Sequence, residues 1–198
     1  MAEQSILDRL SVTPEEFMAV IEEHPGLQGL LIKYLVEEKF KKIHLSDKNI
    51  SRVTKHDNYN NKKKGDLAVV YKDVEFIICL KALQPNKVQE TTQGWVGKVP
   101  FDSKERREVL LPNGRRVKTT CFLKSEFDII ATGFFTFENT LRFVFAKSSD
   151  LPSSNYHNYT KPQRRFLLPT SITVSWPPKP PFTEDLISLM DDIVEAQI

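Results

Sequence analysis

The pattern of apolar positions predicts helices at the beginning of the chain. Thr13-Pro14-Glu15-Glu16 has a capping threonine, a proline for the first helical position and a glutamate three residues after the cap. Apolar residues at helical spacing follow, and His24-Pro25-Gly26 ends this helix. From about residue 27 to residue 44, leucines and a tyrosine recur with helical spacing and predict a second, longer helix.

The apolar stripe of the second helix carries one acidic side chain. At about 100° per residue, Glu38 falls within about 20° of Leu31, whereas Glu37 points away from the stripe. A carboxylate on the buried side of a helix is unfavourable unless it has a partner. Two interpretations stay open: Glu38 lies at the rim of the core, or it reaches into a site as a ligand.

Two compact apolar segments predict the centre of a sheet. Residues 67–71 and 76–80 are β-branched or aromatic and are separated by a short polar turn, as in a hairpin. Neither segment alternates polar with apolar residues, so we expect both faces of this sheet to be covered by packed helices.

The remaining segments complete a mixed pattern of strands and helices. We expect a short strand at 50–54, a hairpin at 108–118, and strands at 127–135 and 141–146. Residues 85–104 have the composition of a loop, and residues 176–181 that of a stiff extended segment. Thr183 is expected to cap a last amphipathic helix. The pattern predicts an α/β (α+β) fold in one domain, with a helix at 1–26, a core at 27–150 and an extension at 151–198.

Composition restricts the class of protein. The chain has 198 residues, of which 40% are hydrophobic and 27% charged, as in an ordinary folded domain. Two cysteines are too few for a disulfide scaffold or a four-cysteine zinc site. The sequence shows neither a membrane-spanning run nor a secretory signal, so we expect a cytoplasmic protein without membrane contact.

The formal net charge of +2 is small, but its distribution is uneven. Acidic residues gather near both ends, and basic residues gather at 39–64 and 104–118. This arrangement is compatible with a phosphate-binding face between acidic ends, and also with ordinary solvated surfaces.

An acid and a lysine meet at one end of the predicted hairpin. If Asp73 and Val74 form the turn, Asp66 faces Lys81, and if the turn is one residue earlier, Asp66 faces Cys79. Side chains alternate along a strand, so residues 79 and 81 share a face in either register. The pair is either a cross-strand salt bridge or part of a site for phosphodiester hydrolysis. In such a site a carboxylate holds a divalent metal and a lysine stabilises negative charge.

The order Asp66, then Cys79-Leu80-Lys81, then Gln84 resembles the active-site signature of the PD-(D/E)XK nuclease superfamily, which includes type II restriction endonucleases. Other segments look like a group of bacterial proteins described as restriction endonucleases. These segments are Gly94-Trp95-Val96-Gly97, Arg106-Arg107-Glu108-Val109, Phe127-Asp128-Ile129 and residues 176–182. The resemblance implies a restriction-endonuclease-like mixed central sheet flanked by helices.

The resemblance also implies roles. Asp66 would be the metal-binding acid, Lys81 the catalytic lysine and Gln84 the glutamine found in some branches. Glu38 would match an acid that some members carry on the first core helix, and with Asp66 it would bind Mg²⁺ or Mn²⁺. Cys79 stands in place of the second acid, and a thiol is mostly neutral at pH 7 and prefers soft metals. Either Glu38 supplies the missing carboxylate, or the protein is a weakened or inactive relative that still binds DNA, or the position was altered.

The leading hypothesis is a metal-dependent endodeoxyribonuclease of restriction-enzyme type that acts on double-stranded DNA. A homodimer would supply the two sites that cutting both strands requires. The alternative is a degenerate nuclease fold that serves as a DNA-binding or protein-interaction module. A third hypothesis is an interaction protein that uses residues 176–181 and the last helix without touching DNA. The candidate DNA contacts are Lys62, Lys63, Lys64, Arg106, Arg107, Arg115 and Arg116.

Overall fold

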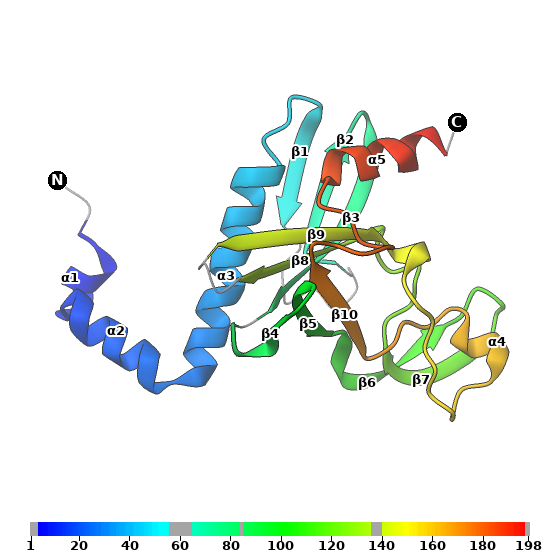
Figure 1. Cartoon of the computed structure of the whole chain (residues 1–198), viewed down its shortest axis with the longest axis horizontal. Helices are drawn as coiled ribbons and strands as arrows, with labels where there is room; N and C mark the ends of the chain where they lie inside the picture. The colour runs from blue at the N-terminus through cyan, green and yellow to red at the C-terminus, as the bar shows by residue number, and fades with distance from the viewer. Residues whose placement is uncertain (1–3, 56–64, 84, 136–139, 197–198) are drawn as a thin grey trace.

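A computed structural model describes residues 4–55, 65–83, 85–135 and 140–196 (Figure 1). Three helices come first: α1 (Ile6–Leu10), α2 (Pro14–Glu23) and α3 (Pro25–His44). The strands that follow are β1 (Ile50–Lys55), β2 (Leu67–Tyr71), β3 (Val74–Leu83), β4 (Val88–Thr91), β5 (Gly94–Pro100), β6 (Asp102–Leu110), β7 (Arg116–Cys121), β8 (Ile129–Phe135), β9 (Leu141–Lys147) and β10 (Ser171–Trp176). Short 3₁₀ turns lie at Pro85–Lys87 and Ser148–Asp150, and the other helices are α4 (Lys161–Arg164) and α5 (Leu186–Glu195).

The central sheet has the order β1-β2-β3-β8-β9. Its strands are antiparallel except for the pair β3–β8, which is parallel. The predicted class, a mixed central sheet with flanking helices, is confirmed at this level. A three-stranded sheet, β10-β5-β4, and a hairpin, β6-β7, complete the strands.

The β2–β3 turn determines the register of the hairpin. Lys72 and Asp73 both have positive φ, at 46° and 65°, as a two-residue turn between twisted strands requires. Leu67 therefore pairs with Ile78, and Tyr71 with Val74. The turn is the earlier of the two that the sequence allowed.

The two faces of the central sheet have different covers. One face packs against α3 and α5 through side chains such as Phe40, Phe145 and Met190. The other packs against β5 and β10, with Cys79 and Val99 in the same cluster. Both faces are covered, as predicted, but the second cover is a sheet rather than a helix.

Two predictions about local structure are wrong. Residues 88–100 form strands rather than a loop, because β5 pairs with the distant β10. Residues 171–176, for which no element was predicted, form β10. Asp185, not Thr183, caps α5: its side chain accepts a hydrogen bond of 2.9 Å from the backbone N–H of Ser188. Thr183 pairs by its backbone with Phe145 in β9 instead.

Helix α3 packs on the sheet with a face other than the predicted one. Val36 and Phe40 are fully buried, and a Cβ at Gly133 of β8 would lie 2.6 Å from Val36, so the glycine lets the helix approach closely. Glu37 is 3% exposed, whereas the Glu38 side chain is 71% exposed. The predicted orientation of these two acids is wrong because only the second half of α3 lies against the sheet.

Glu37 is held at the edge of the core by two lysines. Lys41 Nζ lies 2.8 Å from its carboxylate, and Lys55 Nζ lies 2.7 Å away. Burial would raise the pKa of Glu37, but the hydrogen bonds and charges of Lys41 and Lys55 outweigh it, and the pKa is lowered. The carboxylate thus ties α3 to the end of β1.

None of the helices among the described residues is both long enough and apolar enough to cross a bilayer.

We expect Glu37→Gln to lower the free energy of unfolding by about 1–3 kcal/mol, because two lysines lose a buried charged partner. Glu38→Gln is the matched control: it removes an exposed contact with the same Lys41 and should change stability by less than about 0.5 kcal/mol. Urea unfolding measures both variants. Equal effects would contradict the anchoring role.

The same pair gives a test by pH. Because the pKa of Glu37 is lower in the folded than in the unfolded protein, its contribution is complete above the unfolded pKa and is lost as pH falls through the folded value. The stability difference between native protein and Glu37→Gln should therefore shrink below about pH 4.

Candidate functional site

Asp66 and Cys79 lie opposite each other at the end of the β2–β3 hairpin that is far from its turn. The backbone N–H of Asp66 donates to the carbonyl of Ile78 at 2.8 Å, which extends the ladder by one residue. Its Oδ2 accepts a hydrogen bond from the backbone N–H of Leu80, also at 2.8 Å. The carboxylate is therefore fixed against β3, beside Cys79.

Gly65 allows this approach. Its φ is 81°, and an added Cβ would clash with the side chain of Ile77. Proline, whose ring fixes φ near −65°, does not fit this conformation. The backbone at position 65 therefore favours glycine over other residues.

Cys79 is a neutral, buried thiol. It is 3% exposed, and burial raises its pKa to about 12; the charge of Lys81 opposes the shift and that of Asp66 adds to it. Both side chains therefore act on the thiol from close by. A protonated thiol is a poor ligand for a hard cation, so Cys79 does not replace the missing carboxylate.

Lys81 projects from β3 on the same face as Cys79. Its Nζ lies 5.4 Å from the ring centre of Phe101 and 5.3 Å from that of Phe122, distances typical of cation–π contacts. Asp66 and Lys81 do not form the salt bridge that one interpretation expected, and among the described residues Lys81 has no ion pair. The ammonium is thus held by aromatic rings, with its charge uncompensated by a neighbouring carboxylate.

Thr132 is a polar neighbour that sequence reasoning missed. It is the parallel partner of Lys81 on β8 and is fully buried. Its hydroxyl oxygen has no hydrogen-bond partner in the described structure. The available signal was one threonine within the apolar run of β8, but only the register places it beside Lys81.

The donor set suits a divalent metal only weakly. Magnesium is commonly held by one or two carboxylates, with water and substrate phosphate as the other ligands. Asp66 supplies one carboxylate, and no cluster of three or more His, Cys, Asp or Glu side chains with metal-binding geometry is found within the described ranges. The residues at this site would therefore hold a divalent ion only through Asp66, and phosphate oxygens of a substrate would have to supply further ligands.

Glu38 does not join this site. It lies on α3, which covers the face of the sheet opposite to Cys79, and its carboxylate contacts Lys41 at 3.0 Å. The hypothesis that Glu38 supplies the second carboxylate is wrong for this arrangement.

The remaining predicted site residues divide into three groups. Lys62, Lys63, Lys64 and Gln84 lie outside the described residues. Arg107 forms a two-pronged ion pair with Glu126 and also donates to the carbonyl of Cys121 at 3.2 Å, so its charge is already compensated. Arg116 pairs with Glu108 at 2.8 Å, whereas Arg106 and Arg115 are exposed and make no ion pair with any described residue.

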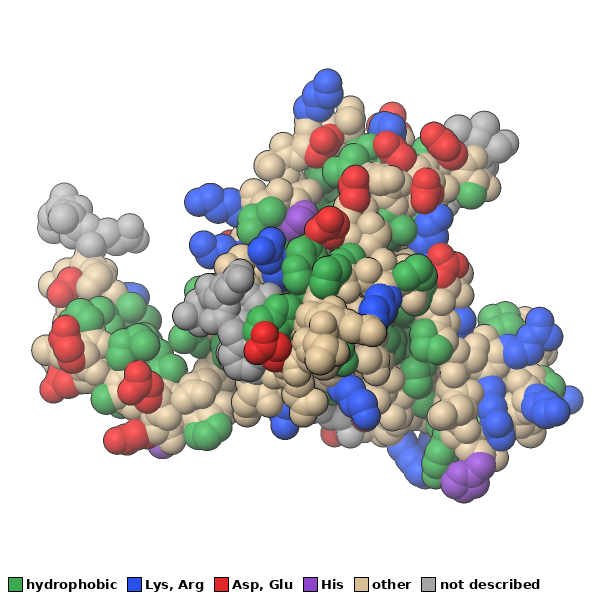
Figure 2. Space-filling model, viewed as in Figure 1, with side chains coloured by type: hydrophobic (Ala, Val, Ile, Leu, Met, Phe, Trp, Pro, Cys, Tyr) green, Lys and Arg blue, Asp and Glu red, His purple; other side chains and the backbone are tan. Residues whose placement is uncertain are grey.

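Exposed cations gather on one lobe, which we define as residues 102–121 and 151–170 and call the basic lobe. It contains β6, β7 and α4 and has a small apolar core of its own. Residues 151–170 contain no acid. Lysine and arginine side chains stand out on this side of the molecule (Figure 2). Those exposed on the lobe are Arg106, Arg115, Arg116, Lys118, Lys161 and Arg165.

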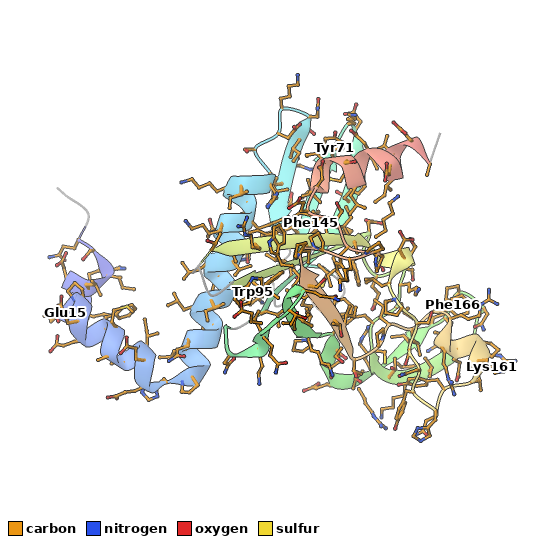
Figure 3. All side chains as sticks on the ribbon, in the orientation of Figure 1. Glu15, Tyr71, Trp95, Phe145, Lys161 and Phe166 are labelled. Atoms are coloured by element: carbon orange, nitrogen blue, oxygen red, sulfur yellow. The ribbon has the colours of Figure 1, made fainter. Side chains whose placement is uncertain are left out.

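The basic lobe lies at the opposite end of the molecule from the N-terminal helices. Lys161 of the lobe and Glu15 of α2 mark the two ends (Figure 3). The acidic residues of α2 are thus far in space from the basic lobe (Figure 3).

Comparisons with protein-family models, with curated proteins and with solved structures found no match. The candidate site therefore rests on its own geometry. Asp66, Cys79 and Lys81 are brought together as predicted, Glu38 and Arg107 are engaged elsewhere, and Thr132 is added.

We expect both cysteines to resist modification in the folded protein, because each is buried and the Cys79 thiol is protonated. A thiol titration with Ellman's reagent at pH 8 should find no fast-reacting thiol in native protein and two after unfolding in urea. Rapid reaction of a single native thiol, absent in Cys79→Ser, would contradict the buried, protonated state.

Proposed function

We propose that the chain is a metal-dependent endodeoxyribonuclease of restriction-enzyme type that hydrolyses phosphodiester bonds in double-stranded DNA. The observation that carries the proposal is the meeting of Asp66 with an uncompensated Lys81 on one face of the β2–β3 hairpin. The order of these residues along the chain also resembles the nuclease signature. A cytoplasmic location belongs to the same proposal, since both thiols are free.

Each residue has a defined task in this proposal. Asp66 would hold Mg²⁺ or Mn²⁺ with its carboxylate, and such an ion would supply Lewis-acid chemistry for the phosphate and for an attacking water. Lys81 stabilises the negative charge that develops on the phosphate oxygens. The aromatic contacts with Phe101 and Phe122 hold the ammonium of Lys81 in place.

The basic lobe provides a surface for the DNA backbone. Arg106 and Arg115 are exposed and free of ion pairs among the described residues, so both are available to phosphates. Cutting both strands at one position requires two copies of the site, and we include a homodimer in the proposal.

DNA binding without cleavage is the second candidate, and Cys79 favours it. The buried neutral thiol supplies no second carboxylate beside Asp66, and the described residues contain no cluster of three or more potential metal ligands. A single carboxylate holds a hard cation less tightly than two. The same basic lobe would then serve binding alone.

Cleavage of plasmid DNA with Mg²⁺ or Mn²⁺ distinguishes the two candidates. If native protein is a nuclease, Lys81→Ala should reduce the rate by at least about 100-fold, a typical effect of removing one group that stabilises transition-state charge. Cys79→Glu should raise the rate or the metal affinity, because it restores a second carboxylate. Lys48→Ala, at an exposed lysine between α3 and β1, is the control for a general loss of charge.

No cleavage by native protein but metal-dependent cleavage by Cys79→Glu would establish the second candidate. Cleavage that persists in both Lys81→Ala and Asp66→Asn would show that the activity does not come from this site.

Binding to DNA should depend steeply on salt, because phosphate contacts release condensed counterions. Removing two contacts in Arg106→Ala/Arg115→Ala should reduce the slope of log K against log salt by about 2. Fluorescence anisotropy of a labelled duplex measures the slope, with Lys48→Ala as the control. An unchanged slope in the double variant would place the DNA away from the basic lobe.

A further inference from the structure

The N-terminal helices expose an unusual amount of apolar surface. We call residues 5–35, which hold α1, α2 and the first half of α3, the N-terminal arm. Ten of the fourteen large apolar side chains that are exposed in the described structure lie here: two on α1, three on α2 and five on α3. Scattered exposed leucines are ordinary, but a concentration of this kind marks an interaction surface.

The arm stands away from the rest of the molecule. It projects from the sheet in Figure 1, and apolar side chains are visible along it in Figure 2. Helix α1 has no buried residue, and α2 buries only Ile21. The main contact of α2 is with α3, and neither α1 nor α2 packs extensively on any described strand.

Helix α3 has two apolar faces on opposite sides. Val36 and Phe40 in its second half face the sheet. Leu31 and Leu35 in its first half are 37% and 46% exposed, and Leu31 lies about 180° around the helix from Phe40. An amphipathic stripe normally faces an apolar partner, and the described residues of this chain cover the second stripe only in part.

The size of the surface fits a dimer interface. A fully exposed apolar side chain of this size has an accessible area of roughly 100 Å². Because the ten side chains are each about half exposed, together they present on the order of 500 Å² of apolar surface. A stable interface buries about 800 Å² on each partner, a little over half of it apolar.

The charges of the arm and of α3 are complementary to each other. Helix α2 carries Glu15, Glu22 and Glu23, and α3 carries Lys39 and Lys42 beyond the end of its exposed stripe. None of these five forms an ion pair with another described residue. In a two-fold symmetric dimer, α2 of each copy would lie along α3 of the other. The glutamates of α2 would then face the lysines of α3 at both of these symmetry-related contacts.

We propose that the N-terminal arm is the surface through which a second copy of this chain binds, with α2 of each copy packed along the exposed stripe of α3 of the other. The arm lies away from the basic lobe, so pairing leaves that lobe open. Cleavage of both strands, as proposed above, requires a second copy of the site, and the N-terminal arm is the surface that would bind this second copy. Its test uses neither DNA nor metal, so its failure is distinguishable from failure of the nuclease proposal.

Light scattering after size-exclusion chromatography tests this proposal on the full chain. Native protein should elute as a dimer at tens of micromolar, and Leu31→Glu should raise the dissociation constant at least tenfold. Leu110→Glu is the matched control, because Leu110 is 62% exposed on β6, outside the arm. Circular dichroism of each variant verifies that the fold is retained.

A charge exchange tests the arrangement of the two copies. Glu22→Lys/Glu23→Lys and Lys39→Glu/Lys42→Glu should each weaken self-association, and an equimolar mixture should recover it, because both inter-copy contacts then join opposite charges. A monomeric native protein, or a dimer that Leu31→Glu leaves intact, would overturn the proposal. Failure of the mixture to recover association would overturn the crossed packing of α2 on α3.

Discussion

The register of the β2–β3 hairpin determines the rest of the site. A two-residue turn at Lys72 and Asp73 forces β3 to return with Ile78 beside Leu67, and from there the alternation of side chains places Cys79 across from Asp66. A slip by one residue would turn Lys81 toward α3 and Leu80 toward the second sheet. Because both faces of the hairpin are buried in different clusters, such a slip would put a charged side chain into the helix-covered core.

Much of the fold could be predicted because its signals are local. The cap at Thr13, the apolar hairpin segments and the strands around Ile130 and Val144 are each recognised from adjacent residues. The second sheet was missed because β5 and β10 are far apart in sequence, and β5, with two glycines and a proline, shows no clear alternation. Residues 171–176 of β10 do alternate polar and apolar side chains, so this strand had a local signal that was not used. Thr183 was misjudged for a related reason: its backbone is paired with β9, which no helix-cap pattern reveals.

The candidate site was predictable to the extent that it depends on strand periodicity. Asp66, Cys79 and Lys81 follow from counting along one hairpin. Glu37, Glu38 and Thr132 depend instead on how α3 and β8 are placed against that hairpin, which is tertiary information. The error at Glu38 is informative, because the stripe taken for the core side of α3 is the side the chain leaves uncovered. Periodicity identifies a face that needs a partner, not which partner it receives.

One ring joins the candidate site to the basic lobe. The ring of Phe122 contacts both the ammonium of Lys81 and the guanidinium of Arg107, each about 5.3 Å from the ring centre. Arg107 also forms an ion pair with Glu126. Both cations therefore pack on the same ring. If β6 shifted when a polyanion bound to it, Arg107 would move with the strand. The electrostatic potential at the ammonium of Lys81 would then change, although the polyanion did not touch Lys81. In the proposed nuclease, DNA binding and cleavage would then be linked through Phe122, and a change in the size of this side chain would alter both.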